Sequence, residues 1–352
     1  MPIPTEPIGS IPRPAYLIDA LGDRASGKIS DDALLQLTRR ALEETVRALE
    51  GTGSPVITDG EQSKPSFATY PLHGATNLAA AGVVIPFKDG HTRQLPVLAS
   101  GPFRYRHYAD SYLREAKKLT SLPVKQAVIS ASAMSLLYPQ DGIPKYSREQ
   151  FISDLLNESE KDIRGCLNAG AYNVQIDFTE ARLALKLDPS KSLLKMFISL
   201  NNELLGRFTA AERAKIGVHS CPGGDHDSTH SADVSYDDLL PELFQLEAGS
   251  FYLTFAGEQD KKSVLKAIKK SVKPGQRVFL GVTDVLNPRI ETPEEVASLL
   301  VDAAKVISAD QLGSCDDCGF SPFADDRSTA REIAFEKIKS RVQGTKLAES
   351  RI

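Results

Sequence analysis

The sequence contains no tryptophan and only four cysteines in 352 residues. So few cysteines exclude a disulfide scaffold, and a cysteine near a histidine then indicates metal binding or catalysis. Long apolar runs are also missing, which excludes a membrane-spanning helix. Neither sign of charge dominates, because the net charge is −4, and no basic stripe interleaved with aromatic residues favours a nucleic-acid partner. The first seven residues lack the basic and apolar regions of a signal peptide, so we expect a cytoplasmic protein.

The pattern of apolar residues predicts strands that alternate with helices. We expect strands near residues 8–10, 55–59, 124–130, 172–177, 215–221, 250–255, 277–283 and 311–314, and helices near 31–50, 106–119, 147–169, 193–205, 236–246, 261–272, 293–307 and 325–342. Eight such units most simply close into an α/β fold of the (β/α)₈ TIM-barrel type. The rival is an open doubly wound sheet, but no glycine-rich nucleotide loop follows any predicted strand.

Residues 62–102 interrupt this alternation. Two short apolar segments there flank Asp89-Gly90, a pair typical of a hairpin turn. We therefore predict one barrel domain over residues 1–352, with a hairpin-containing insertion after the second strand that covers an opening.

Polar residues follow many of the predicted strands, where the active site of such a barrel lies. In chain order they are Ser10, Asp59 and Glu61, residues 130–135, Asp177, His219 and Cys221, Glu258, Asp284, and residues 315–318. The fifth and eighth strands end on the same rim, so Cys318 can reach His219 and Cys221. One imidazole and two thiols form a zinc-ligand set that leaves a position for substrate or a fourth ligand. Cys315 and Cys318 could instead form a redox pair.

Other histidines, cysteines and carboxylates give less specific signals. His226 and His230 are alternative ligands, although a solvated loop is the plainer interpretation, and Cys166 fits a helix core. A zinc site suits thiol activation, because coordination deprotonates a thiol whose free pKa is about 8.5. Glu61 and Asp177 are then candidates to bind the ammonium group of an amino-acid thiol, or else they form rim salt bridges or helix caps.

Several of these motifs occur in an order that resembles a known family. Ile8-Gly-Ser10, Asp59-Gly-Glu61, Val174-Gln-Ile-Asp177, His219-Ser-Cys221 and Asp317-Cys318-Gly319 are similar to the catalytic barrel of cobalamin-independent methionine synthase. The resemblance implies zinc-dependent methyl transfer to the sulfur of homocysteine. It also implies that His219, Cys221 and Cys318 bind Zn²⁺, and that Ser10, Glu61 and Asp177 bind the substrate's carboxylate and ammonium groups.

The sequence departs from that family at several points. Only one barrel is present, the sixth strand carries no glutamate ligand, and Asp177 is followed by Phe178-Thr179-Glu180 instead of a Glu-Pro pair. Glu258 is the nearest substitute for the missing ligand. The methyl donor stays open between methyl-tetrahydrofolate, a methylated corrinoid protein and another small alkyl donor, since the tryptophan used beside folate is absent.

Other functions remain open at this point. They are a related zinc enzyme of different thiol or C–S chemistry (a thiol alkyltransferase or lyase), a metal-free barrel of the uroporphyrinogen decarboxylase type, and a barrel that binds ligands without turnover.

Overall fold

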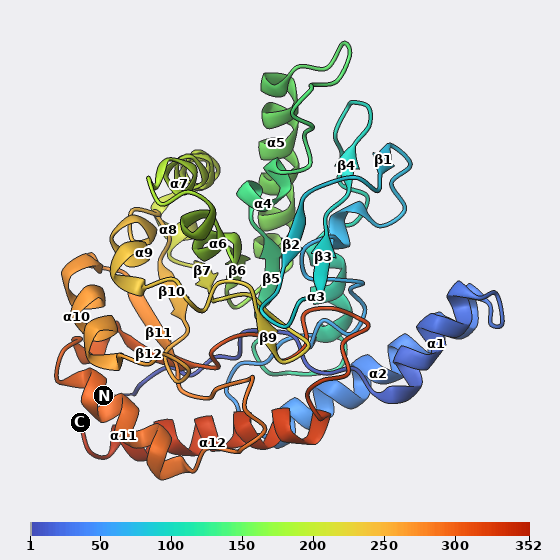
Figure 1. The fold of residues 1–352 in the computed structure, drawn as a ribbon. Coiled ribbons are helices and arrows are strands. Elements are labelled where there is room, and N and C mark those ends of the chain that lie inside the picture. Colours follow the sequence, from blue (N-terminus) through green and yellow to red (C-terminus); the bar gives the residue numbers. More distant parts are fainter. Residues whose placement is uncertain (1) are drawn as a thin grey trace.

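The computed structural model describes residues 2–352. Six parallel strands form the central sheet in the order β12-β11-β10-β7-β6-β5 (Figure 1). They are β5 (Gln126–Ile129), β6 (Val174–Asp177), β7 (Ile216–Ser220), β10 (Ser250–Leu253), β11 (Arg277–Gly281) and β12 (Leu312–Cys315). Apart from Arg277, every residue in these strands is buried. Such continuous burial is expected when helices cover one face of a parallel sheet and side chains fill the other.

Two segments near the N-terminus continue the sheet at its two edges. Thr5 pairs in parallel with Ser314 of β12, and Ile57 pairs in parallel with Val124 just before β5. The two added segments also contact each other, because Thr58 Oγ1 donates a hydrogen bond to the Gly9 carbonyl at 2.8 Å. Eight segments therefore form a ring, and the predicted TIM barrel is confirmed.

Helices surround this ring and join successive strands (Figure 1). They are α1 (Ala15–Ala25), α2 (Asp31–Gly51), α3 (Ala109–Lys117), α4 (Ala131–Ser135), α5 (Arg148–Asn168), α6 (Glu180–Leu187), α7 (Ser192–Leu205), α8 (Ala210–Arg213), α9 (Tyr236–Leu243), α10 (Lys261–Ser271), α11 (Pro293–Ala304) and α12 (Arg331–Glu349), with 3₁₀ turns at Tyr70–Leu72 and Ala309–Gln311. Predicted helix starts are often marked by side-chain caps. The hydroxyl of Ser30 accepts from Ala33 N, and Ser147 forms a capping box with Gln150.

The prediction missed the short helices α1, α4, α6 and α8 and placed the last helix too early. Residues 325–330 precede α12 because the Asp326 carboxylate accepts hydrogen bonds from both the backbone N–H and the hydroxyl of Ser328. This local pairing stabilises a turn in competition with a helix. No helix in residues 2–352 is long and apolar enough to cross a bilayer.

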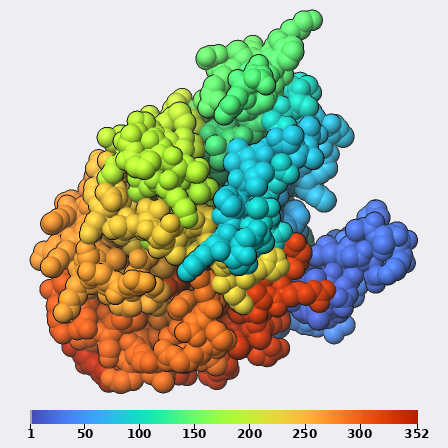
Figure 2. Space-filling view, in the orientation of Figure 1, coloured from blue at the N-terminus to red at the C-terminus, as the bar shows by residue number. Residues whose placement is uncertain are grey.

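The insertion after the second barrel segment forms two antiparallel pairs, as the expected hairpin requires. Strands β2 (Val84–Pro86) and β3 (Thr92–Gln94) pair around the predicted turn, and β1 (Leu78–Ala79) pairs with β4 (Val97–Leu98). A small hairpin of β8 (Gly224–Asp225) and β9 (Ser228–Thr229), which was not predicted, follows β7. The two hairpins meet where Lys88 N donates to the Thr229 carbonyl at 3.0 Å. Figure 2 shows the cyan insertion lying against the yellow segment that contains β8 and β9.

Candidate metal and thiol site

The three predicted zinc ligands lie together at the carboxyl ends of the barrel strands. His219 lies in β7, Cys221 directly follows that strand, and Cys318 lies three residues beyond β12. Side chains two positions apart point to the same side of a strand. One ligand atom from each residue lies within 4.8 Å of the other two, and the two sulfur atoms are 3.0 Å apart.

The imidazole of His219 is oriented by a neighbouring strand. Its Nδ1 lies 3.2 Å from the carbonyl oxygen of Tyr252, so we assign the proton to Nδ1. Its Nε2 is buried and has no hydrogen-bond partner within residues 2–352. In zinc sites, one ring nitrogen of a histidine ligand usually donates a hydrogen bond to a carboxylate or a backbone carbonyl, while the other nitrogen binds the metal. The residues present therefore fit a zinc ion.

The electrostatics of the group favour protonated side chains. The hydrogen bond with Cys221, together with burial, raises the pKa of the Cys318 thiol well above its ordinary value. Burial opposes a charged imidazole at His219, but the Cys318 thiol and the Asp177 carboxyl outweigh this effect and raise the pKa of His219 overall. A divalent cation reverses such a preference for protonated thiols, because metal ligation requires the thiolate.

The same three residues line a small pocket. Ser10, Glu61 and Asp177 line it too, so all six of these predicted residues come from distant parts of the chain to one place. Its free volume is about 70 Å³. The side chains of Ile85 and Phe87, from the β2–β3 hairpin and its turn, form part of the wall, so the insertion covers the pocket.

Glu61 forms an ion pair, as its salt-bridge alternative expected, with Lys64, a partner that the sequence analysis did not name. Lys64 Nζ lies 2.9 Å from Glu61 Oε1, and both side chains are almost fully buried. Burial raises the pKa of Glu61 while Lys64 opposes the rise. Lys64 Nζ also donates to the Ala127 carbonyl at 2.9 Å. Because the second carboxylate oxygen of Glu61 has no hydrogen-bond partner in the described chain, it is available to a ligand.

Asp177 ends β6 and is held by a residue on the same strand. Gln175 Nε2 donates to Asp177 Oδ1 at 2.7 Å, and burial raises the pKa of Asp177. The amide oxygen of Gln175 is buried without a partner in the part of the chain that the structure describes, and Gln175 lines the pocket. The alternation along a strand could have identified Gln175, since it lies two residues before Asp177.

Ser10 faces the loop that carries Cys318. Its hydroxyl accepts a hydrogen bond from Ser321 N at 3.2 Å. A Cβ atom added at Gly319 would lie 2.2 Å from that hydroxyl oxygen, so only glycine permits this close approach. The glycine next to Cys318 thus allows the eighth strand's loop to pack against the first.

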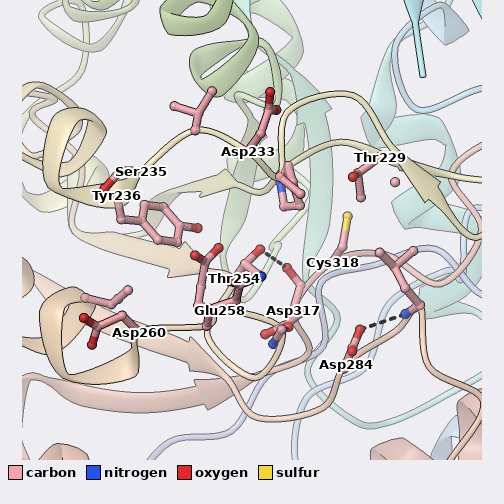
Figure 3. A pocket seen from close by; sticks show the side chains of 18 of the residues that line it. Thr229, Asp233, Ser235, Tyr236, Thr254, Glu258, Asp260, Asp284, Asp317 and Cys318 are labelled. Carbon is pink, nitrogen blue, oxygen red and sulfur yellow. Dashed lines mark hydrogen bonds between the residues drawn. The ribbon is translucent and has the colours of Figure 1, made fainter. Parts of the chain in front are cut away.

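Glu258 lies outside the group of three ligands. Its carboxylate is 2.7 Å from the guanidinium of Arg182, and it lines a second, larger cavity. Figure 3 shows Glu258 across that cavity from Cys318. Cys315 also lies apart from the group, because it packs inside the barrel with Ile8, Tyr252 and Phe279.

The two loop histidines differ from each other. The expectation of a solvated loop is wrong for His230, which is buried under Phe87 of the insertion, with ring centroids 5.5 Å apart. Burial lowers the pKa of His230 to about 4, so the ring is neutral. His226 is exposed and lies near Asp225 and Asp326. Cys166 is fully buried in α5, as predicted.

Arg93 of the insertion is a further residue that the sequence did not single out. Its guanidinium binds the buried carboxylate of Asp225 in β8 and also that of Asp325, with a nitrogen-to-oxygen distance of 2.9 Å in the second pair. It therefore links the insertion to two loops on the barrel rim.

Comparisons with known proteins agree with this architecture. Residues 3–343 match the family described as cobalamin-independent synthase, catalytic domain. A methionine synthase of Sulfurisphaera tokodaii is 24% identical over 99% of this chain and 94% of its own length. One from Thermococcus kodakarensis is 23% identical over 98% of this chain and 93% of its own.

Solved structures share the fold at low sequence identity. A B12-independent methionine synthase from Shewanella sp. W3-18-1, in complex with selenomethionine, superposes with a TM-score of 0.78 and 19% identity, covering 100% of this chain and 99% of that one. A putative B12-independent methionine synthase from Listeria monocytogenes gives 0.69 and 20%, covering 98% and 97%.

Proposed function

Because the chain belongs to the cobalamin-independent synthase catalytic-domain family, we propose that this methyltransferase moves a methyl group to the sulfur of homocysteine in a zinc-dependent reaction. The observation that carries the proposal is the position of His219, Cys221 and Cys318 in one pocket with two buried carboxyl groups. The free thiols of all four cysteines suit a reducing compartment, so we place the reaction in the cytoplasm.

His219, Cys221 and Cys318 would hold the zinc ion. Bound there, zinc would lower the pKa of the substrate thiol so that it is a thiolate at neutral pH. The Tyr252 carbonyl keeps the His219 ring in position through Nδ1. The backbone N–H of Gly223, 3.4 Å from Cys221 Sγ, donates to that sulfur and helps to hold it in position.

The carboxyl groups would bind the amino-acid end of the substrate. Asp177 and the free oxygen of Glu61 are acceptors for an ammonium group, and the Ser10 hydroxyl is a donor for a carboxylate. An ammonium ion beside these groups also lowers their raised pKa values, since an opposite charge favours the ionised carboxylate. The solved Shewanella relative contains selenomethionine, a selenium analogue of the expected product, which supports an amino-acid ligand.

The insertion would exclude water during transfer. Phe87 contacts the buried His230, and Lys88 and Arg93 tie the hairpin to the rim. Closing a pocket in this way strengthens the electrostatic interactions inside it and prevents side reactions of the thiolate.

Metal analysis tests the proposal. Purified protein should contain about one zinc per chain, and X-ray absorption should show an added sulfur neighbour when homocysteine is present. Cys221→Ala should lose most of the zinc and the thiol alkylation. Cys315→Ala is the matched control, because both cysteines are fully buried but only Cys221 belongs to the ligand group. Full zinc retention in Cys221→Ala, or equal loss in both variants, would refute the assignment.

A further inference from the structure

A buried glutamine lines the thiol pocket, the small pocket that holds His219, Cys221 and Cys318. Gln175 lies in β6, and its side chain is completely buried. Its Oε1 makes no hydrogen bond with any residue in 2–352. Buried polar groups are normally hydrogen-bonded, because burial removes the water that would otherwise bind them. An unpartnered oxygen at a binding pocket is therefore ready to accept a hydrogen bond from a ligand.

The orientation of this amide is fixed by Asp177. Gln175 Nε2 donates to Asp177 Oδ1 at 2.7 Å. An ionised carboxylate only accepts hydrogen bonds, and an ammonium ligand keeps Asp177 ionised, so the amide nitrogen must face Asp177. Reversal of the amide would set two acceptors against each other. Oε1 is therefore fixed as the free acceptor of Gln175.

The neighbouring strands do not satisfy this oxygen. In the register of the sheet, Ala127 of β5 and Gly217 of β7 lie on the two sides of Gln175. Neither residue has a polar side chain. Ala127 also lines the thiol pocket, so a small side chain beside Gln175 leaves space next to its amide.

We propose that Gln175 is a specificity-determining residue that selects thiols carrying a free primary ammonium group. The inference rests on the proposed function, because that function brings the ammonium of an amino-acid thiol to Asp177. A primary ammonium has three N–H donors. The pocket offers three acceptors, which are the free oxygen of Glu61, the Asp177 carboxylate and Gln175 Oε1.

Such a set of acceptors rejects thiols that lack the ammonium group. A thiol without an amine leaves all three buried acceptors unpaired, and an N-acylated amine supplies one N–H and no charge. Sites built to hydrogen-bond a substrate group discriminate strongly against analogues that lack it, because their own buried polar groups are then left without partners. The substrate class is therefore thiols of α-amino acids with an unmodified amine.

Binding without a methyl donor tests this role and needs no turnover. Titration calorimetry of the zinc-containing protein compares L-homocysteine with γ-mercaptobutyrate, which has the same carbon chain, carboxylate and thiol but no amine. Gln175→Met should weaken L-homocysteine binding about 10- to 100-fold, the usual effect of losing a hydrogen bond to a charged group. It should not weaken the binding of γ-mercaptobutyrate, and its zinc content should equal that of the parent.

Gln126→Met is the matched control. Gln126 lies on the neighbouring strand β5, is also buried, and also has an amide oxygen without a partner in the described chain, but it does not line the thiol pocket. Its substitution should leave the binding of both thiols unchanged. Equal weakening of L-homocysteine binding in Gln126→Met and Gln175→Met would overturn the inference, because both losses would then reflect the removal of a buried amide.

Two further measurements separate direct contact from an effect through Asp177. In an Asp177→Ala background, direct contact predicts that Gln175→Met still weakens L-homocysteine binding about tenfold, whereas a role confined to holding Asp177 predicts no effect. A crystal structure of the zinc-containing parent with L-homocysteine does not depend on the folding of any variant. The ligand nitrogen should lie about 2.7–3.2 Å from Gln175 Oε1. No effect in the Asp177→Ala background, or a ligand nitrogen beyond hydrogen-bond distance, would overturn the inference.

The outcomes distinguish this inference from the proposed function. Equal weakening of both thiols by Gln175→Met, or weakening of neither, would overturn the selective role of Gln175 alone. A parent protein that binds γ-mercaptobutyrate as tightly as L-homocysteine would overturn it too. A parent protein that holds no zinc and binds neither thiol would overturn the proposed function, and this inference with it.

Discussion

Replacement of Lys64 by methionine should destabilise the protein, because it removes one partner of the buried ion pair beside the thiol pocket. The Lys64 ammonium lies 2.9 Å from Glu61 Oε1 and 4.6 Å from the centre of the Tyr70 ring, with both charged side chains at most 3% exposed. Lys64→Met leaves the Glu61 carboxylate buried without its counter-ion. Removal of one partner from such a pair costs about 3–5 kcal/mol of unfolding free energy.

The loss should depend on pH in a direction that the structure specifies. Burial already raises the native-state pKa of Glu61 above its value in the unfolded chain, and Lys64 opposes this rise. Without Lys64 the pKa rises further, so the native state keeps a proton that the unfolded state has released. Stability of Lys64→Met relative to the parent should therefore fall as pH rises above the native-state pKa that Glu61 has in the parent. We expect a smaller loss at pH 5 than at pH 8.

Urea unfolding of a four-member cycle measures the effect. Glu61→Gln alone leaves Lys64 without its counter-ion and should also destabilise the protein, whereas the double variant should lose far less than the sum of the two single variants. The coupling should be at least about 2 kcal/mol. Lys305→Met, which breaks the exposed pair with Asp302, should cost about 1 kcal/mol or less. Additive effects of the two buried substitutions, or a loss independent of pH, would refute the reasoning.

Three further substitutions test Asp177 in the pocket, Glu180 at the start of α6, and Arg93 in the insertion. Asp177→Asn should keep zinc but raise the KM for homocysteine about 10- to 100-fold, because a charge-assisted hydrogen bond to the ammonium group is lost; an equal effect on a thiol without the amine would mean that Asp177 is only structural. Burial raises the pKa of Glu180 to about 7, so between pH 4.5 and pH 7 the unfolded state releases this proton before the native state does. The parent should therefore lose up to about 3 kcal/mol of stability over this pH range, and Glu180→Gln should not. Urea unfolding at both pH values measures this, and identical pH slopes for variant and parent would contradict it. Arg93→Met should loosen the insertion, seen as faster amide exchange in residues 84–94 at unchanged zinc content, because its bonds to Asp225 and Asp325 are lost; unchanged exchange would show that other contacts hold the hairpin.

The barrel could be predicted because its evidence is local. Each strand is a short run rich in apolar residues. Most of the long helices have apolar residues at helical spacing and a capping residue, such as Ser147 before α5. Once the strands are parallel, their carboxyl ends share one rim, and this places His219, Cys221 and Cys318 near each other even though 97 residues separate the two cysteines. Side-chain alternation along β7 then directs His219 and Cys221 to the same side.

The partners of these residues were decided only by the tertiary structure. The sequence does not show that Lys64 pairs with Glu61, that Arg182 holds Glu258 away from the ligand group, or that the insertion buries His230. These contacts join loops and helices whose relative positions depend on how the whole barrel packs, and no periodic pattern encodes them. The sequence by itself therefore determined the strand ends and the chemical groups on them. Tertiary packing decided which groups are paired, which are free, and how much space each cavity has, because pairing and volume depend on distances between segments far apart in the chain.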